Sequence, residues 1–221
     1  MKILFLGDSI TDAYHSFDSE NLGEGYVRMI YEKMNLACGC ANSTTEFQIS
    51  NKGIDGFTVP RVYEMWQSIP DKSSWDIVSV LVGVNDVGVW MDCGRSDSWI
   101  KNAAREFAVT YEDMMTDILD HGIQHVLLME PFIFPYPEKY SLWQPWLTEI
   151  STYIQDISQR YKLTFLPLQK RLYDAAISEG FSAVTVDGIH LTEKGNRILA
   201  DAWYDCASHH TLLLPNGIRH A

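Results

Sequence analysis

Short apolar runs alternate along the chain with longer stretches in which apolar residues recur at helical spacing. The runs cover residues 2–6, 47–50, 77–82, 126–129 and 163–166, and the second of them is the weakest. Continuous apolar runs of this length are typical of strands buried on both faces of a parallel sheet. The pattern therefore predicts about five parallel strands.

Helical periodicity appears between the last strands and again near the end of the chain. Three sets of residues each form one apolar stripe on a helix: Phe107, Tyr111, Met114, Met115 and Ile118; Trp146, Ile150, Tyr153, Ile154 and Ile157; Ile198, Leu199, Ala202, Trp203 and Cys206. Thr192 is expected to cap the last of these helices, with Glu193 in its first turn. Alternating strands and helices predict a doubly wound α/β sheet, in which ligands bind at the carboxyl ends of the strands.

Composition places the chain among globular proteins and excludes two classes of partner. The 221 residues are expected to form a single domain, 1–221, with 46% hydrophobic and 21% charged residues. A formal net charge of -12 would repel phosphate backbones and anionic lipid headgroups, so we expect neither a nucleic-acid partner nor a membrane partner. The oligomeric state is left open.

The first residues of the chain and its cysteines indicate the cellular compartment. No run reaches the roughly 18 apolar residues of a spanning helix, and the first run is too short for a signal-peptide core. The sequence therefore predicts a cytoplasmic protein, although a removed leader would not be visible. Cys38, Cys40, Cys93 and Cys206 are expected to be free thiols, because Cys38 and Cys40 are too close together for a zinc knuckle.

Two motifs supply a nucleophile and a base. Ser9 directly follows the first strand in Gly-Asp-Ser-Ile-Thr, where a serine is exposed at the top of a sheet and either reacts or merely caps a helix. Asp187 precedes His190 by three residues with Gly188 between them, so its carboxylate can fold back onto the ring Nδ1 and leave Nε2 free as a base. A plain surface turn is the alternative for this second motif.

Two further motifs offer hydrogen-bond donors at strand ends. The Gly-rich segment that begins at Asn51 and includes Gly53 leaves backbone N–H groups open to a ligand, unless it is an ordinary turn. Asn85, after the third long run, can donate its side-chain amide to a developing oxyanion, unless it forms an Asx turn. Each motif is weak alone, but a nucleophile, a base, its orienting acid and two donors at predicted strand ends together favour an acyl-transfer site.

These four blocks resemble those of the SGNH hydrolase superfamily, also called GDSL-type esterases and lipases. Ser9, Gly53, Asn85 and His190 match the four named residues, and the blocks extend over nearly the whole chain. Ile10 in place of the usual leucine is a mild departure. The resemblance implies a three-layer flavodoxin-like fold with strand order 2-1-3-4-5. It also implies an oxyanion hole built from the Ser9 N–H, the Gly53 N–H and the Asn85 side chain.

The expected activity is hydrolysis of small esters through an acyl-enzyme, with Ser9, His190 and Asp187 as the catalytic residues and with no metal or organic cofactor. Aromatic residues crowd the loops 90–99 and 132–143 and either contact substrate or pack the loops onto the body. Asp8, Trp90, Phe132 and Trp143 are candidate substrate-binding residues. An acidic, aromatic rim favours a neutral polar substrate, so we expect removal of O-acetyl groups from carbohydrates or similar small esters.

Competing functions stay open at this point. A lysophospholipase or thioesterase would act on longer acyl chains, a general carboxylesterase would be less selective, and a flavodoxin-like binding module would not react at all. The binding module lacks its phosphate loop after the first strand. Among the other histidines, His121 and His125 are expected at a helix end and a strand start rather than on a metal, and His15 is a candidate to line the pocket.

Overall fold

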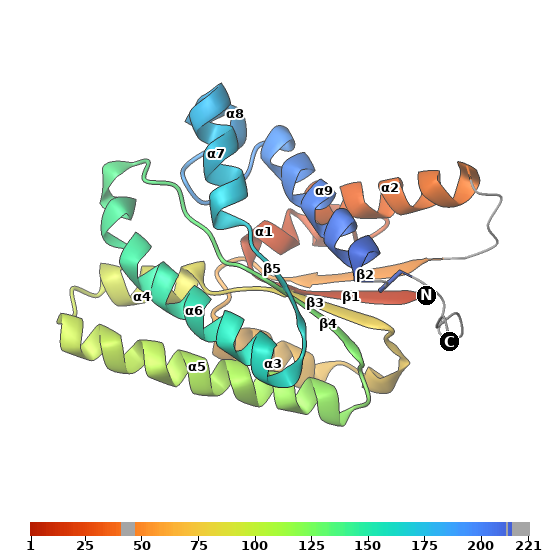
Figure 1. Ribbon diagram of the computed structural model, residues 1–221, viewed down its shortest axis with the longest axis horizontal. Helices are drawn as coiled ribbons and strands as arrows, with labels where there is room; N and C mark the ends of the chain where they lie inside the picture. Colours follow the sequence, from red (N-terminus) through yellow and green to blue (C-terminus); the bar gives the residue numbers. More distant parts are fainter. Residues whose placement is uncertain (41–46, 211, 214–221) are drawn as a thin grey trace.

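One parallel sheet forms the centre of the computed structural model, which describes residues 1–40, 47–210 and 212–213 (Figure 1). The sheet has five strands in the order β2-β1-β3-β4-β5. They are β1 (Lys2–Gly7), β2 (Gln48–Gly53), β3 (Ile77–Leu81), β4 (His125–Met129) and β5 (Thr164–Leu166). The predicted number, direction and order of the strands are confirmed.

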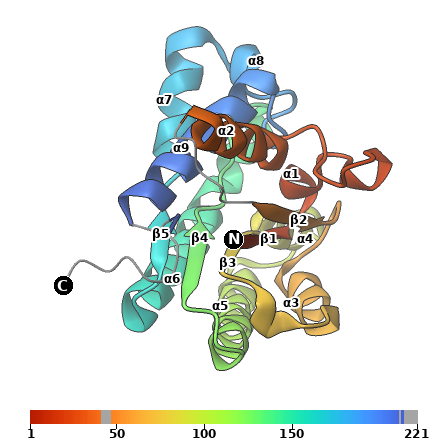
Figure 2. The same cartoon turned by 90° about the vertical axis from the view of Figure 1, so that its right-hand side faces the viewer.

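Helices cover both faces of the sheet and make the fold three-layered. On one face lie α3 (Val59–Ser68), α5 (Asp97–Asp120) and α6 (Gln144–Tyr161); on the other lie α2 (Tyr26–Cys40), α7 (Gln169–Glu179), α8 (Phe181–Val184) and α9 (Glu193–His209) (Figures 1 and 2). The short helices α1 (Ser9–Asp12) and α4 (Val84–Asp92) follow β1 and β3 directly. Single turns of 3-10 helix occur at η1 (His15–Phe17), η2 (Lys72–Ser74) and η3 (Glu138–Leu142).

The apolar stripes predicted from spacing face the sheet. Tyr111, Met114 and Ile118 of α5 are completely buried, and so are Ile150 and Ile154 of α6. Each stripe removes apolar surface from water on one side of its helix only, which is why the opposite side is polar. The helix that ends the described fold, α9, begins as predicted, because the Thr192 side chain accepts a hydrogen bond from the Gly195 N–H at 3.2 Å.

An aromatic cluster joins β1 to the helices above it. The ring of Phe5 lies between Tyr26 of α2 and Trp203 of α9, with centroid distances of 5.8 and 5.4 Å. The Trp203 indole N–H donates to the Ser79 hydroxyl of β3 at 2.9 Å, so this buried polar pair is satisfied. The cluster brings a residue close to the C-terminus onto the first strand of the sheet.

The edge strand β2 is longer than its sequence pattern predicts. The apolar run covers residues 47–50, whereas the strand continues through Asn51, Lys52 and Gly53. Polar residues are tolerated there because β2 has a neighbour, β1, on one side only. The extension matters because Gly53 then pairs with Gly7, which also pairs with Leu81, so that three strands end side by side.

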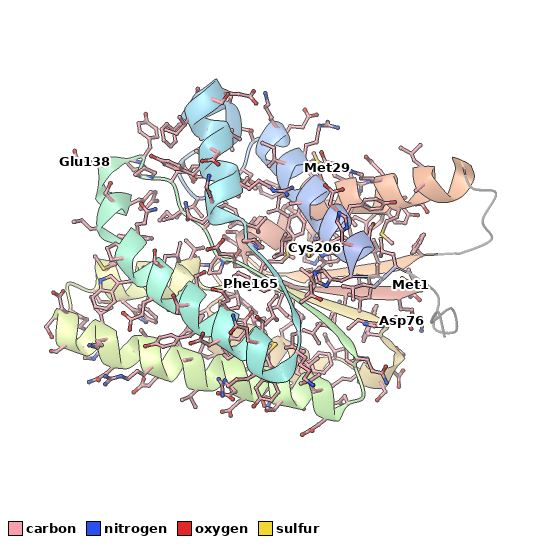
Figure 3. All side chains as sticks on the ribbon, viewed as in Figure 1. Met1, Met29, Asp76, Glu138, Phe165 and Cys206 are labelled. Carbon is pink, nitrogen blue, oxygen red and sulfur yellow. The ribbon has the colours of Figure 1, made fainter. Side chains whose placement is uncertain are left out.

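At the amino ends of the strands, the described residues include none of the candidate site residues. Asp76 lies beside the start of β1 in Figure 3, and its carboxylate accepts the Lys2 N–H at 2.7 Å. Within the described ranges, no helix combines the length and apolarity needed to cross a membrane. Cys93 and Cys206 are free thiols, whereas the side chains of Cys38 and Cys40 lie outside the described part of the structure.

Candidate active site

Ser9 is presented by a tight turn between β1 and α1. Asp8 caps α1, since its Oδ1 atom accepts the Ile10 N–H at 3.0 Å. Gly7 permits the turn, because a Cβ atom at this position would lie 2.2 Å from the Thr11 hydroxyl oxygen. As the first residue of α1, Ser9 has no intrahelical acceptor for its own N–H, which stays open to a ligand.

The loop before α9 folds Asp187 back onto His190. The Asp187 Oδ1 atom accepts the backbone N–H groups of Ile189 and His190 at 2.9 and 2.8 Å, and Oδ2 lies 2.7 Å from His190 Nδ1. A carboxylate only accepts hydrogen bonds, so Nδ1 carries the ring proton and Nε2 has a free lone pair. Gly188 occupies a position with φ of 98°, where a Cβ would collide with the Tyr136 carbonyl oxygen.

The two segments meet at hydrogen-bond distance. His190 Nε2 lies 2.9 Å from Ser9 Oγ, so the structure brings Ser9, His190 and Asp187 into one chain of hydrogen bonds. The side chains of His190 and Asp187 are 46% and 47% exposed, which leaves the site accessible to a substrate. Burial of the Asp187 carboxyl opposes ionisation, but hydrogen bonds from His190 and Ile189 outweigh it and hold its pKa below the usual value.

Asn85 reaches the same end of the sheet from the first turn of α4. Its Nδ2 atom donates to the Phe57 carbonyl oxygen at 3.0 Å, which uses one of its two amide hydrogens and leaves the other available. The neighbouring Asp86 accepts the Val59 N–H with both carboxylate oxygens, at 3.2 and 3.1 Å. Residues 85 and 86 therefore fix the loop between β2 and α3 against the start of α4.

The expectation for Gly53 needs correction. Its N–H already donates to Asn51 Oδ1 at 2.9 Å in a buried hydrogen bond, so it is not free to bind an oxyanion. Gly53 serves packing instead, because a Cβ at this position would lie 2.2 Å from the Asp12 backbone nitrogen. Gly56, three residues on, is exposed with φ of 72°, and its N–H has no acceptor among the described residues.

The candidate substrate-binding residues are buried rather than exposed. Asp8 and Phe132 are each 1% exposed, and Trp90 and Trp143 are each 7% exposed. The Trp90 ring packs edge-on against Phe107, and Trp143 packs in the same way against Tyr140. These aromatic residues are therefore packed inside the protein, which is the alternative that the sequence had left open. The expected loop 90–99 is in fact the end of α4, a short connection and the start of α5, and Trp90 lies in α4.

Two buried acids near the nucleophile carry perturbed pKa values. Burial raises the pKa of Asp8 to about 7, against the opposing hydrogen bond from the Ile10 N–H. Burial likewise raises the pKa of Asp86 to about 8, and the nearby charge of Asp8 adds to the shift. Asp8 Oδ2 has no hydrogen-bond partner, which is consistent with a carboxyl that is kept neutral.

The remaining histidines have structural places. His121 ends α5 and its Nδ1 atom contacts the Asp117 carbonyl oxygen at 2.8 Å, while His125 begins β4. His15 follows α1, and its Nδ1 atom lies 2.7 Å from Asp12 Oδ1. Within the described ranges, no group of three or more His, Cys, Asp or Glu side chains is arranged to hold a metal.

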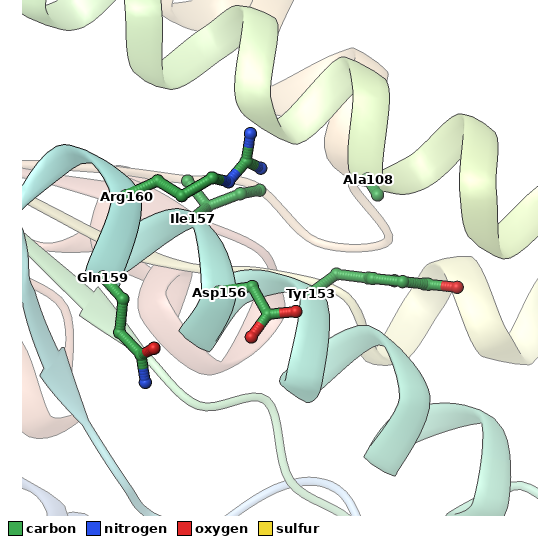
Figure 4. Close-up of a pocket in the computed structure, with 6 residues that line it drawn as sticks. All are labelled: Ala108, Tyr153, Asp156, Ile157, Gln159 and Arg160. Carbon is green, nitrogen blue, oxygen red and sulfur yellow. The ribbon is translucent and has the colours of Figure 1, made fainter.

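A separate cavity of about 400 Å³ lies between α5 and α6 (Figure 4). It is lined by one residue of α5 and five of α6: Ala108, Tyr153, Asp156, Ile157, Gln159 and Arg160. None of these residues belongs to the loops at the carboxyl ends of the strands. The cavity is therefore distinct from the Ser9 site.

Sequence reasoning did not single out Gly56, Asp86 or Asp12, which the structure places beside this site; Asp12 Oδ2 accepts the Asp55 N–H, next to Gly56, at 3.2 Å. The Asp55-Gly56 pair is a common turn signal, and a glycine directly after such an aspartate often takes a positive φ. That signal could have directed attention from Gly53 to Gly56. Asp86 and Asp12 are ordinary acidic residues in the sequence, and only their hydrogen bonds distinguish them.

Comparison with known proteins identifies relatives of the same architecture. The sequence model of the GDSL-like Lipase/Acylhydrolase family matches residues 5–198. An acetylxylan esterase from Geobacillus stearothermophilus is 25% identical over 214 residues, which cover 91% of each chain. An alpha/beta hydrolase enzyme from the metagenome of Lake Arreo, Spain, has a TM-score of 0.78 at 19% identity, covering 94% of each chain.

A variant of acetyl xylan esterase from Geobacillus stearothermophilus has a TM-score of 0.77 at 23% identity and covers 93% of each chain. Further solved structures are catalytic mutants of that esterase. In them a serine near the start, an aspartate, or a histidine three residues after the aspartate is replaced by alanine. The structural matches show a shared fold.

Proposed function

The chain belongs to the GDSL-like lipase/acylhydrolase family and is a carboxylic ester hydrolase, and from this premise we propose that it removes O-acetyl groups from carbohydrates or similar small esters. The reaction proceeds through an acyl-enzyme on Ser9. One observation carries the proposal: the continuous hydrogen-bond chain from Ser9 Oγ through the His190 ring to Asp187. In the Geobacillus esterase, the aspartate and the histidine replaced in the mutants described as catalytic have the same spacing, which supports these roles.

In the first half of the reaction, His190 Nε2 takes the hydroxyl proton while Ser9 Oγ attacks the carbonyl carbon of the ester. The carbonyl π electrons move to the oxygen and produce a tetrahedral oxyanion. Asp187 holds the ring in its reactive tautomer and stabilises the imidazolium. The intermediate then collapses, the bond to the sugar oxygen breaks, and the departing alcohol takes the proton from Nε2.

The second half repeats these steps with water. His190 Nε2 removes a proton from a water molecule, whose oxygen attacks the acetyl carbon of the Ser9 ester. Collapse of the second tetrahedral intermediate releases acetic acid, and the Ser9 oxygen recovers its proton from His190. Every proton is moved by His190, so the free lone pair on Nε2 is the central requirement.

The oxyanion is held by three donors in this proposal. They are the Ser9 N–H, the second amide hydrogen of Asn85, and the Gly56 N–H, which replaces the Gly53 N–H because that group is already bonded. All three follow the ends of neighbouring strands: Ser9 begins α1 after β1, Gly56 lies in the loop after β2, and Asn85 is in the first turn of α4 after β3. Loss of one donor of this kind costs about 10²–10³ in kcat.

The shape of the site favours a small acyl group on a bulky alcohol. The side chains of His190 and Asp187 are almost half exposed, so the alcohol part of a substrate can be large and polar. A long acyl chain would need an apolar groove, and the aromatic residues expected to provide one are buried in packing contacts. The name of the Geobacillus relative, acetylxylan esterase, points in the same direction.

A chain-length series tests both the reaction and the substrate class. We expect hydrolysis of p-nitrophenyl esters to fall steeply beyond acetate and butyrate, and acetylated xylo-oligosaccharides to release acetate. A rate that rises towards octanoate would instead indicate a lysophospholipase or thioesterase. Ser9→Ala is the control, and it should abolish both activity and labelling by a fluorophosphonate probe; an unlabelled wild-type protein would favour a binding module.

A further inference from the structure

The turn that carries Gly56 is held on one side by an aspartate that is itself held by a histidine. We infer that Asp12 and His15 are positioning residues for the oxyanion hole. The inference rests on the proposed function, since it assigns a supporting role in the same site. Neither residue contacts the reacting atoms; both act through the backbone N–H of Asp55, the residue before Gly56.

The pair Asp12 and His15 repeats the local geometry of Asp187 and His190. In both, a histidine follows an aspartate by three residues, and the carboxylate binds both the backbone N–H and the ring Nδ1 of that histidine. For His15 these distances are 3.2 and 2.7 Å. The side chain of His15 is only 12% exposed and that of Asp12 is 21% exposed, so the contact is largely shielded from water.

The second oxygen of Asp12 reaches the glycine turn. Asp12 Oδ2 accepts the Asp55 N–H at 3.2 Å, immediately before Gly56. The turn itself is closed by the Phe57 N–H, which donates to the Ile54 carbonyl oxygen at 3.2 Å. Gly56 is the third residue of this turn, and its φ of 72° belongs to the type II family, in which the central peptide is flipped relative to type I.

The direction of the Gly56 N–H therefore depends on which way that central peptide faces. Two contacts bracket it: Asp12 holds the Asp55 N–H on one side, and Asn85 holds the Phe57 carbonyl on the other. The Ile54 N–H also donates to the Gly7 carbonyl oxygen at 3.1 Å, which fixes where the turn begins. Loss of the Asp12 contact leaves the turn attached but frees the peptide that presents the donor.

The arrangement also explains why His15 is next to the nucleophile segment without belonging to the catalytic chain. Its ring fixes Asp12 Oδ1, and this leaves Oδ2 directed at the Asp55 N–H. An aspartate held at one oxygen loses less side-chain freedom when the other oxygen binds. His15 therefore affects the oxyanion hole only through Asp12.

A double-mutant cycle tests the inference on the full chain with p-nitrophenyl acetate. We expect Asp12→Ala to lower kcat about tenfold, less than loss of a whole donor, with KM changed less than about twofold. The rate of fluorophosphonate labelling, which also produces an oxyanion, should fall in parallel. His15→Ala should lower kcat about threefold, and the double variant should equal Asp12→Ala alone, because both act through one contact.

His121→Ala is the matched control. His121 forms a similar contact with an aspartate, 3.1 Å from Asp117 Oδ1, but at the end of α5, and its removal should leave kcat unchanged. If Asp12→Ala does not fold, Asp12→Asn keeps the shape of the side chain and should lower kcat by a smaller factor. The inference is overturned if the Asp12 variant that folds keeps wild-type kcat, if it changes KM alone, or if the losses of the two single alanine variants multiply. An active Ser9→Ala protein would instead overturn the proposed function itself.

Discussion

The Nε2 atom of His190 lies 2.9 Å from the hydroxyl oxygen of Ser9, although 181 positions separate the two residues in the sequence. The contact exists because β1 lies inside the sheet, between β2 and β3, and α9 packs across it through Trp203 and Phe5. The packing of α9 thus sets the distance between the proposed nucleophile and the proposed base. Five predictions follow from this site and its surroundings.

Replacing Asp187 by alanine should lower kcat by about 10²–10⁴, because His190 loses the group that selects its tautomer. The loss should be smaller than that of Ser9→Ala, since the imidazole would remain near the hydroxyl. Steady-state rates on p-nitrophenyl acetate measure both. Asp174→Ala is the control, because Asp174 pairs with Lys170 on an exposed face of α7. Equal rates for Asp187→Ala and wild type would contradict the role of Asp187.

Replacing Asn85 by alanine should lower kcat by about 10²–10³, the usual effect of one oxyanion donor. The variant also loses the contact to the Phe57 carbonyl, so the labelling rate with a fluorophosphonate should be measured beside kcat. Both should fall together while KM changes little. A change confined to KM would show that Asn85 binds the substrate rather than the oxyanion.

Alanine at Gly53 should lower stability, whereas alanine at Gly56 should lower activity. Gly53→Ala should destabilise the fold, because its Cβ would lie 2.2 Å from the Asp12 nitrogen in a packed region. Gly56→Ala meets no atom within 4 Å, but alanine disfavours its positive φ and should flip the turn. We expect a lower melting temperature for the first variant and a lower kcat with a nearly unchanged melting temperature for the second. A lower kcat for Gly53→Ala at an unchanged melting temperature, with normal kcat for Gly56→Ala, would indicate that Gly53 is the oxyanion donor.

Stability should fall as the pH rises through the neutral range, owing to the two buried acids. Burial raises the pKa of Asp86 from 3.8 to about 8 and that of Asp8 to about 7. The folded protein therefore retains protons that the unfolded chain releases. The stabilisation is fully present below pH 3.8, is lost as the pH rises, and changes no further above about pH 8.

Urea unfolding between pH 5 and pH 8 measures this effect. Each acid contributes a slope of up to about 1.4 kcal/mol per pH unit below its folded pKa. Asp86→Asn keeps an oxygen that can accept the Val59 N–H and removes the titration, so its unfolding midpoint should depend less on pH than that of the wild type. An identical pH dependence in both proteins would show that Asp86 is ionised in the fold.

Replacing Trp143 by alanine should reduce stability rather than substrate affinity. The side chain is 7% exposed and packs on Tyr140, so its loss should cost about 3–5 kcal/mol through the cavity that remains. Thermal unfolding measures the loss, and KM of the remaining folded enzyme should be unchanged. A raised KM with an unchanged melting temperature would indicate that Trp143 contacts the substrate.

Much of the fold could be predicted because buried strands and helix stripes leave regular apolar patterns. The central strands were found within one or two residues, since both of their faces are apolar. The edge strand β2 was predicted too short, because Asn51 and Lys52 interrupt its pattern. Pairing with β1, rather than side-chain character, extends that strand to Gly53.

The sequence could predict the site residues that act through their side chains. It could predict less well the residues that act through a backbone N–H. Ser9, Asp187, His190 and Asn85 stand out because their side chains have few substitutes in acyl transfer. A backbone N–H has no sequence signature of its own. The Asp55-Gly56 turn signal favours Gly56, but only the hydrogen bond from the Gly53 N–H to Asn51 shows that the Gly53 donor is already used. For the aromatic residues the sequence left substrate contact and packing as alternatives, because composition does not show which side chains are buried; the structure shows Trp90, Phe132 and Trp143 buried.

The assembly of the site from both ends of the chain has a consequence for biosynthesis. A ribosome releases the segment bearing Ser9 long before it has translated His190, so under the proposed mechanism the growing polypeptide has a nucleophile but no base. A product that stops upstream of α9 should therefore lack esterase activity, whatever part of the sheet it has formed. Activity would then report that translation has passed the segment bearing the histidine.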